Sequence, residues 1–253
     1  MLQDYLWLNP FCCAKKNFAI FVVTLQCDCV MVGLFHGSQK IIRRPIFGAG
    51  NPKNDYGLGL YCTADIDLAI EWACSEEDDG FANRYRIEAD GLSHLHLNED
   101  GYNILNWLAI LLENRTFDLS LLSAVRAKKY ILDNFLPDYQ KYDIITGYRA
   151  DDSYFSFSRA FLSNGITIGQ LKRAMSLGKP GEQTVLRSHA AFERLTFVEA
   201  IPADASVYHP RRMQRDRNAR SAFQQMLQED PGQDAVYVSD IIKEGWKADD
   251  PRL

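Results

Sequence analysis

The chain has 253 residues, of which 47% are hydrophobic and 24% charged, and this composition is typical of a globular protein with a full core. Its formal net charge is −5, so an acidic surface would repel nucleic acids and anionic membranes at long range. The net charge therefore excludes a protein that binds nucleic acids or anionic membranes through long-range electrostatic attraction. One domain of catalytic size is the simplest organisation.

The cysteines predict neither a disulfide framework nor a metal site. The chain contains six cysteines, and it is too long to need disulfide bonds for stability. We expect reduced thiols in a cytoplasmic protein. Cys27 and Cys29 are separated by one residue, but no second close pair with neighbouring histidines completes a tetrahedral zinc site. We therefore expect no bound metal.

The first thirty residues differ from the rest, because they hold four of the six cysteines and most of an apolar stretch, Phe18 to Phe35. A membrane span would bury Asp28, and Asp4 and several aromatic residues precede the two lysines that a signal peptide would need. We predict an N-terminal extension over residues 1–30, non-native or flexible, before a single domain over residues 31–253. A leading strand or hairpin is the alternative, and a signal or anchor segment fits least.

From residue 31 onward the patterns predict short strands scattered among helices. In chain order they are a strand over Val32–Phe35 that ends at His36, a loop over Arg43–Asn54, a strand over Leu58–Thr63, a helix capped by Asp65, a strand over Arg84–Leu97, a long helical region over Asn103–Phe135, a strand over Asp143–Gly147, a helix over Thr167–Leu177, strands over Thr184–Leu186 and Thr196–Ala200, and a charged helix over Arg211–Gln228. The absence of regular βαβ spacing favours an α+β fold.

The segment from Leu34 to Ala73 carries an unusual combination of motifs. It contains His36-Gly37-Ser38 at a strand end, then Gly-x-Gly-x-Tyr-x-Thr, which ends in Tyr61 and Thr63, and then Trp72 on a helix. Each motif alone has an ordinary structural explanation: a turn, a tight strand entry or a core tryptophan. Together, in this order and spacing, they resemble the NAD-binding half of the ADP-ribosyltransferase superfamily, which includes poly(ADP-ribose) polymerases and diphtheria-type toxins. Within it they most resemble a little-described bacterial group of unknown function.

The resemblance implies a split-sheet ADP-ribosyltransferase fold and NAD as substrate. The backbone of Gly37 would then hold the nicotinamide carboxamide, and His36 would bond to a ribose hydroxyl. Tyr61 and Trp72 would sandwich the cationic nicotinamide ring between their aromatic faces. Ser38 and Thr63 would supply hydroxyl contacts.

The superfamily also uses an acidic or amide residue at the start of a later strand, where it contacts the nicotinamide ribose. Glu182 and Gln183 both fit that place, and alternation along a strand allows only one of them to face the site. Glu182 is the stronger chemical candidate, because a carboxylate stabilises an oxocarbenium ion directly. Gln183 is the residue that the most similar bacterial group uses. The alternative is an ordinary turn before a strand.

Two further segments have a functional and a structural interpretation. Asp151 and Asp152 follow a buried strand and would either contact ribose or acceptor, or cap a following helix. Five arginines lie between residues 211 and 220, interrupted by Asp216, and continue into apolar residues. This spacing predicts an amphipathic helix, with an anion-binding face for nucleic acid or an acidic protein as the alternative.

The resemblance implies transfer of ADP-ribose from NAD to a protein or nucleic-acid acceptor, as a single unit rather than a polymer. By analogy with bacterial toxins, it also implies a small antitoxin-like protein partner and no membrane association. The alternatives are an NAD glycohydrolase, in which water replaces the acceptor, and a catalytically inactive module that binds NAD or ADP-ribose.

Overall fold

The strands form two sheets in the computed structural model, which describes residues 31–99, 101–150, 152–233 and 235–253. The first sheet is antiparallel, with the order β1 (Met31–Ser38), β3 (Gly80–Glu88), β7 (Leu195–Ala203). The second has the order β2 (Leu60–Cys62), β6 (Glu182–Leu186), β5 (Ile144–Tyr148), β4 (His94–His96), and its β4–β5 pair is parallel. The expected α+β class is therefore confirmed.

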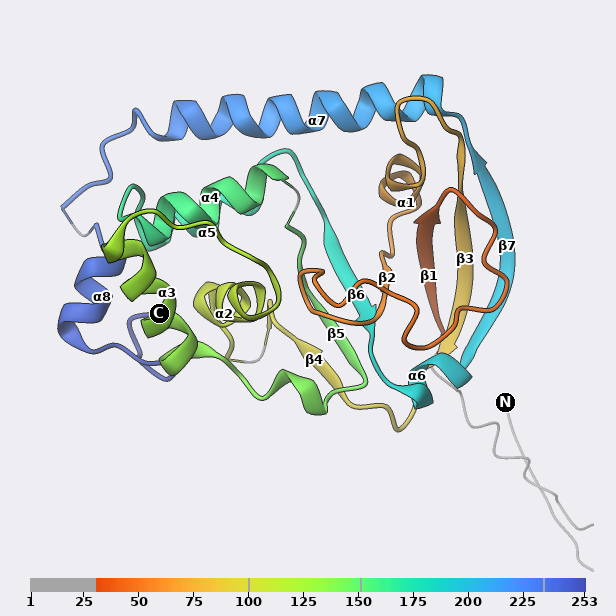
Figure 1. Cartoon of the computed structure of the whole chain (residues 1–253), viewed down its shortest axis with the longest axis horizontal. Helices are drawn as coiled ribbons and strands as arrows, with labels where there is room; N and C mark the ends of the chain where they lie inside the picture. Colours follow the sequence, from red (N-terminus) through yellow and green to blue (C-terminus); the bar gives the residue numbers. More distant parts are fainter. Residues whose placement is uncertain (1–30, 100, 151, 234) are drawn as a thin grey trace, which may run out of the picture.

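Along the sequence the helices are interspersed with the strands, and in space they lie around the two sheets. They are α1 (Ile66–Ala73), α2 (Ile104–Asn114), α3 (Leu122–Phe135), α4 (Asp152–Leu162), α5 (Ile168–Ala174), α6 (His189–Glu193), α7 (Ala205–Met226) and α8 (Val238–Glu244), with a 3-10 turn at Tyr139–Lys141. Figure 1 shows most of them gathered beside the second sheet, α1 beside the first sheet, and α7 extending from the helical side across to α1. α7 contacts α1, α4 and α5, so it links the two halves of the molecule.

Within the described residues, one isolated backbone bridge joins the two sheets, between Phe35 of β1 and Thr63 just after β2. Phe35 in β1 exchanges both backbone hydrogen bonds with Thr63, at N···O distances of 2.8 and 2.9 Å. A small apolar cluster that includes Leu34, Leu60 and Leu186 fills the space beside this bridge. The ends of β1 and β2 are therefore held close together, which places the two halves of the Leu34–Ala73 segment side by side.

The main core lies between the second sheet and the helices beside it. α2 is buried over nine consecutive residues, from Ile104 to Leu112, because it lies between the sheet and the other helices. Asn103 caps this helix and Asn106 completes a capping box, which satisfies backbone groups that would otherwise be buried without partners. Burial of this extent explains the long apolar pattern in the sequence.

Two of the predicted elements are each divided into two in the structure. The single strand expected over Arg84–Leu97 is two strands, β3 and β4, which belong to different sheets. They are separated by a turn in which Leu92 N bonds to Ala89 O and Gly91 adopts a φ of +73°. The helical region expected over Asn103–Phe135 is likewise divided into α2 and α3.

The sequence patterns missed α8, and they gave α4 only as the structural alternative in which Asp151 or Asp152 caps a following helix. α4 contains the run Tyr-Phe-Ser-Phe-Ser, which resembles the alternation of a strand and so hides the helical period. The Arg-rich helix is confirmed, but it begins at Ala205 rather than Arg211 and includes Pro210 in its second turn. Asp204 caps it through a hydrogen bond from Ser206 N.

The expected extension over residues 1–30 lies outside the described residues, as do four of the six cysteines. Cys62 and Cys74 are buried free thiols. In the part of the chain that the structure covers, the helices are all too short or too polar to cross a membrane.

Gly37 allows α1 to lie directly on β1. A Cβ at this position would be 2.9 Å from the backbone nitrogen of Ala73 and closer still to the carbonyl oxygen of Ala69. We therefore expect Gly37→Ala to lower the free energy of unfolding by about 1–3 kcal/mol, because the helix must move away from the strand. Urea denaturation measures this change. Gly33→Ala in the same strand is the control, since a Cβ there meets nothing within 4 Å, and equal loss in both variants would contradict the packing explanation.

Candidate functional site

Two adjoining cavities share the side chains of Asn54 and Tyr61. The first, which we call the His36 cavity, has a volume of about 340 Å³ and lies between β1, β2 and the loop over residues 39–59. The second, the Gln183 cavity, has a volume of about 240 Å³ and includes Trp72 from α1 and Gln183 from β6. The structure thus brings His36, Tyr61, Trp72 and Gln183 to one region.

His36 is oriented by the neighbouring strand. Its Nδ1 lies 2.7 Å from the carbonyl oxygen of Tyr61, so Nδ1 carries the proton and donates. Burial lowers the pKa of His36 below its ordinary value of 6.5, although the hydrogen bond to Tyr61 acts in the opposite direction. At neutral pH the ring is therefore uncharged, and Nε2 is an acceptor for a ligand hydroxyl.

The other walls of the His36 cavity are largely apolar, with Arg44 among them. The apolar contacts come mainly from Ile42, Pro45, Ile46, Leu60 and Phe192. The loop that supplies most of these residues is fixed to β3, because Asn83 accepts from Ile42 N at 2.8 Å and donates to the carbonyl oxygen of Lys40 at 3.1 Å. The cavity therefore offers a flat, apolar group a place beside a histidine and an arginine.

The Tyr61 hydroxyl fixes the loop that precedes β2. It donates to Gly57 O at 2.6 Å and accepts from Tyr56 N at 3.0 Å. Gly57 has a φ of +77°, which explains the glycine at this turn. Tyr56 itself is fully buried and donates to the carbonyl oxygen of Tyr148 at 2.5 Å. The loop between these tyrosines is thereby tied to the second sheet.

Glu182 and Gln183 face in opposite directions from β6. Gln183 is 5% exposed and lines the Gln183 cavity beside Tyr61 and Trp72. Glu182 is exposed and accepts a hydrogen bond from Asn98 Nδ2. Since neighbouring residues of a strand point to opposite faces, only the glutamine faces the cavity.

Asp55 is a buried carboxylate that the sequence reasoning did not assign to the site. Its Oδ2 accepts from Gln183 Nε2 and from Ala150 N, each at 3.1 Å, and its Oδ1 is 3.2 Å from an Arg115 guanidinium nitrogen. Asp55 also lines the Gln183 cavity. The sequence feature that could have indicated Asp55 is its place immediately before the Tyr-Gly-x-Gly-x-Tyr run. The loop at this point is fixed, and it holds Asp55 opposite β6.

Trp72 is covered on one ring face by another side chain. The guanidinium carbon of Arg149 lies 3.4 Å from the centroid of the Trp72 ring, and both residues line the Gln183 cavity. The arrangement shows that this ring face binds a flat, delocalised cation. The expected sandwich of a nicotinamide ring between Tyr61 and Trp72 stays a prediction, and it requires Arg149 to leave the ring.

Gly37, Ser38 and Thr63 do not line either cavity. Ser38 Oγ accepts from Lys40 N at 3.2 Å, and the buried Thr63 Oγ1 accepts from Asp65 N at 3.2 Å, so both hydroxyls serve the local backbone. The backbone of Gly37 is placed differently. Because hydrogen-bond direction alternates along β1 and Phe35 faces Thr63, the N–H and C=O of Gly37 also point away from β3.

Asp151 and Asp152 lie at a break in the described residues. Asp151 lies outside the described residues, and Asp152 is the first residue of α4. A helix therefore follows this pair, as the structural interpretation expected. Among the described residues, no group of three or more metal-binding side chains lies together.

Residues 32–197 match the sequence profile of a family described as "Protein of unknown function (DUF3990)". The matched span contains both cavities except for Arg212, which lines the Gln183 cavity from α7. No curated protein and no solved structure matched the chain.

Proposed function

This chain belongs to the DUF3990 family, and we propose that it transfers ADP-ribose from NAD to a macromolecular acceptor. In this reaction the bond between nicotinamide and the ribose carbon breaks, and nicotinamide leaves with the bonding electrons. A nucleophilic oxygen or nitrogen of the acceptor bonds to that carbon and releases a proton to water. One ADP-ribose unit is transferred in each reaction.

The observation that carries the proposal is the meeting of four predicted residues at two adjoining cavities. His36, Tyr61 and Gln183 come from three strands in both sheets, and Trp72 comes from α1. They are separated by up to 147 residues in the sequence, as 183 − 36 gives. The resemblance depends only on the order and spacing of motifs along the sequence, so the convergence of these residues in space is separate support for the proposal.

The chemistry of each cavity suits one half of NAD. The apolar His36 cavity fits adenosine, with the neutral His36 Nε2 accepting from a ribose hydroxyl. The Gln183 cavity fits the nicotinamide riboside, because Trp72 already holds a flat cation on its ring. The N–H and C=O of Gly37 lie on the edge of β1 that faces β2, and there they are available for the nicotinamide carboxamide.

Gln183 and Asp55 would act together at the nicotinamide ribose. Gln183 Nε2 donates to Asp55. The Oε1 atom of Gln183 is therefore left as the acceptor for the ribose 2′-hydroxyl. Asp55 supplies the negative charge that the amide lacks, close to the carbon where positive charge develops. Arg115 partly balances that charge, so turnover is expected to be slower than with an unpaired carboxylate.

This arrangement favours catalysis over binding alone. An inward glutamine alone would favour a binding module without catalysis, whereas the adjacent Asp55 carboxylate favours turnover. We extend the proposal by analogy to a cytoplasmic bacterial toxin with a small protein antitoxin as partner. A hydrolase differs only in that water replaces the acceptor.

Nicotinamide release from NAD by the purified full chain tests the proposal. We expect release by the wild type that His36→Ala reduces at least tenfold, since a ligand hydroxyl loses its acceptor. His209→Ala, on α7, is the control and should behave as the wild type. Faster release with a cell lysate favours transfer over hydrolysis. The absence of both NAD binding and nicotinamide release in the wild type would contradict the proposal.

A further inference from the structure

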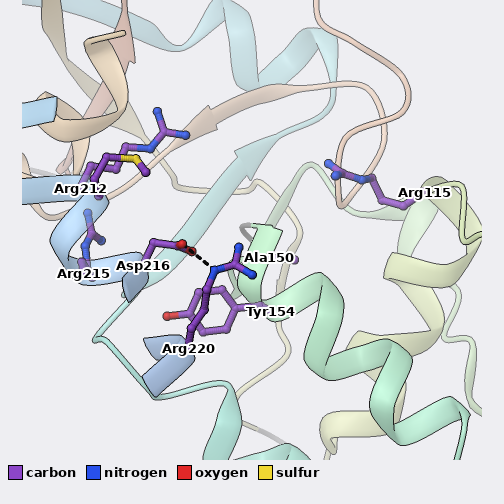
Figure 2. Close-up of a pocket in the computed structure, with 8 residues that line it drawn as sticks. Arg115, Ala150, Tyr154, Arg212, Arg215, Asp216 and Arg220 are labelled. Carbon is purple, nitrogen blue, oxygen red and sulfur yellow. Dashed lines mark hydrogen bonds and ion pairs between the residues drawn. The ribbon is translucent and has the colours of Figure 1, made fainter. Parts of the chain in front are cut away.

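A third cavity, with a volume of about 350 Å³, has four arginines among its eight lining residues. Figure 2 shows Arg212, Arg215, Asp216 and Arg220 along α7, with Arg115 across the cavity from them. Tyr154 from α4 forms part of the floor. We call this space the arginine cavity. Its concentration of positive charge contrasts with the net charge of −5 of the whole chain.

The arginines outnumber the carboxylates that pair with them. Among the described residues these arginines form three pairs: Arg115 with Asp55 at 3.2 Å, Arg220 with Asp216 at 2.7 Å, and Arg215 with Glu71. Arg212 forms no ion pair with any residue that the structure describes.

Arg215 adds hydrogen-bonding capacity to this excess of charge. Its Nη1 is buried and has no hydrogen-bond partner within the described part of the chain. A buried donor of this kind favours an acceptor from outside the protein. The cavity therefore has surplus positive charge, the main property of an anion site, and the unpartnered Arg215 nitrogen lies in a residue of its wall.

The position of the arginine cavity relates it to the proposed reaction. It shares Arg115, Ala150 and Arg212 with the Gln183 cavity, and it shares no lining residue with the His36 cavity. The Gln183 cavity therefore lies between the other two. A ligand in the arginine cavity would approach the ribose carbon from the side opposite the adenosine half of NAD.

The α7 arginines lie outside the family-matched span. That span ends at residue 197, whereas α7 begins at Ala205. The helix is held in place by the Arg215–Glu71 pair with α1, and by Ser153 of α4, which donates to Asp216. The wall of the cavity is therefore fixed, and it is supplied by a segment beyond the part that defines the family.

We propose that the arginine cavity binds the phosphate of the acceptor, and that the acceptor is a phosphorylated nucleotide, free or at the end of a nucleic acid strand. This inference rests on the proposed function. Guanidinium groups bind phosphate through paired hydrogen bonds and also stack on bases. The partly exposed Met213 adds an apolar contact. A nucleotide hydroxyl or ring nitrogen then bonds to the ribose carbon and loses its proton to water, as nicotinamide leaves.

Calorimetric titration with uridine 5′-monophosphate tests the site separately from NAD, because the probe carries no adenine. We expect the full-length wild type to bind it, and Arg212→Ala and Arg220→Ala each to weaken binding about tenfold. Arg217→Ala, at an exposed position of the same helix that is bonded to Gln214, is the matched control and should bind as the wild type. Uridine without phosphate should not bind.

A second probe distinguishes the two sources of phosphate. Tighter and more salt-dependent binding of a 5′-phosphorylated thymidine hexamer indicates a nucleic acid end, and equal binding indicates a free nucleotide. NAD binding is measured on the same proteins, and Arg220→Ala should leave it unchanged. If neither phosphate probe binds while NAD does, the inference about the arginine cavity is wrong and the proposed function still stands. If the protein binds the phosphate probes but neither binds NAD nor releases nicotinamide, the proposed function fails and the arginine cavity is not an acceptor site.

Discussion

Asp55→Asn is expected to reduce nicotinamide release about 100-fold, the usual effect of removing one group that stabilises charge in a transition state. The carboxylate is held by Arg115, by Ala150 N and by Gln183 Nε2, so it lies beside the glutamine that we propose as the ribose contact. Asparagine keeps the size of the side chain but removes the charge. Steady-state nicotinamide release measures the effect, and NAD affinity should change far less.

Glu182→Gln is the control for the loss of a carboxylate. Glu182 is on the same strand as Gln183 but is exposed and bonded to Asn98, so we expect release within about twofold of the wild type. If Glu182→Gln were the more damaging change, the assignment of Asp55 would be wrong. Urea denaturation of both variants separates catalysis from folding, because breaking the buried Asp55–Arg115 pair also lowers stability.

Arg149→Ala is expected to tighten NAD binding about tenfold. The Arg149 guanidinium occupies the Trp72 ring face that a nicotinamide cation would need, and such contacts contribute about 0.5–2 kcal/mol. Removing the side chain abolishes this competition. Calorimetric titration with NAD measures the change in affinity.

Arg252→Ala provides a matched control for this change. Arg252 lies 4.0 Å from the centroid of Trp246 near the C-terminal end, so the substitution removes a similar contact away from the cavities. It should leave NAD affinity unchanged. Weaker binding by Arg149→Ala alone would show that Arg149 holds the ligand instead of covering its place.

The local patterns predicted the elements that place the site. The apolar strand before His36, the glycines before Tyr61 and the Asp65 cap all depend on neighbours in sequence, and β1, β2 and α1 occur as expected. Alternation on β6 correctly predicted that only one of Glu182 and Gln183 faces inward. It did not predict which one, because that depends on how β6 pairs with β2 and β5.

The remaining features depend on contacts between distant segments. Asp55 meets Gln183 across 128 residues, and only the fold brings them together. The contact of Arg149 with Trp72, and the place of Arg212 from α7 in the lining of the Gln183 cavity, likewise join segments that are remote in sequence. The ligand contact of Gly37 stays a prediction, and the structure adds a second reason for this glycine, because the lack of a Cβ lets α1 approach β1. That contact also places Trp72 beside the strand that carries His36.

A structure of the Asp55→Asn chain with NAD tests the central claim most directly, because slow turnover should preserve the bound dinucleotide. We predict adenosine in the His36 cavity with a ribose hydroxyl on His36 Nε2. Nicotinamide should lie against Trp72 in place of Arg149, with its ribose 2′-hydroxyl on Gln183 Oε1. NAD bound elsewhere, or with its two ends exchanged between the cavities, would contradict this account.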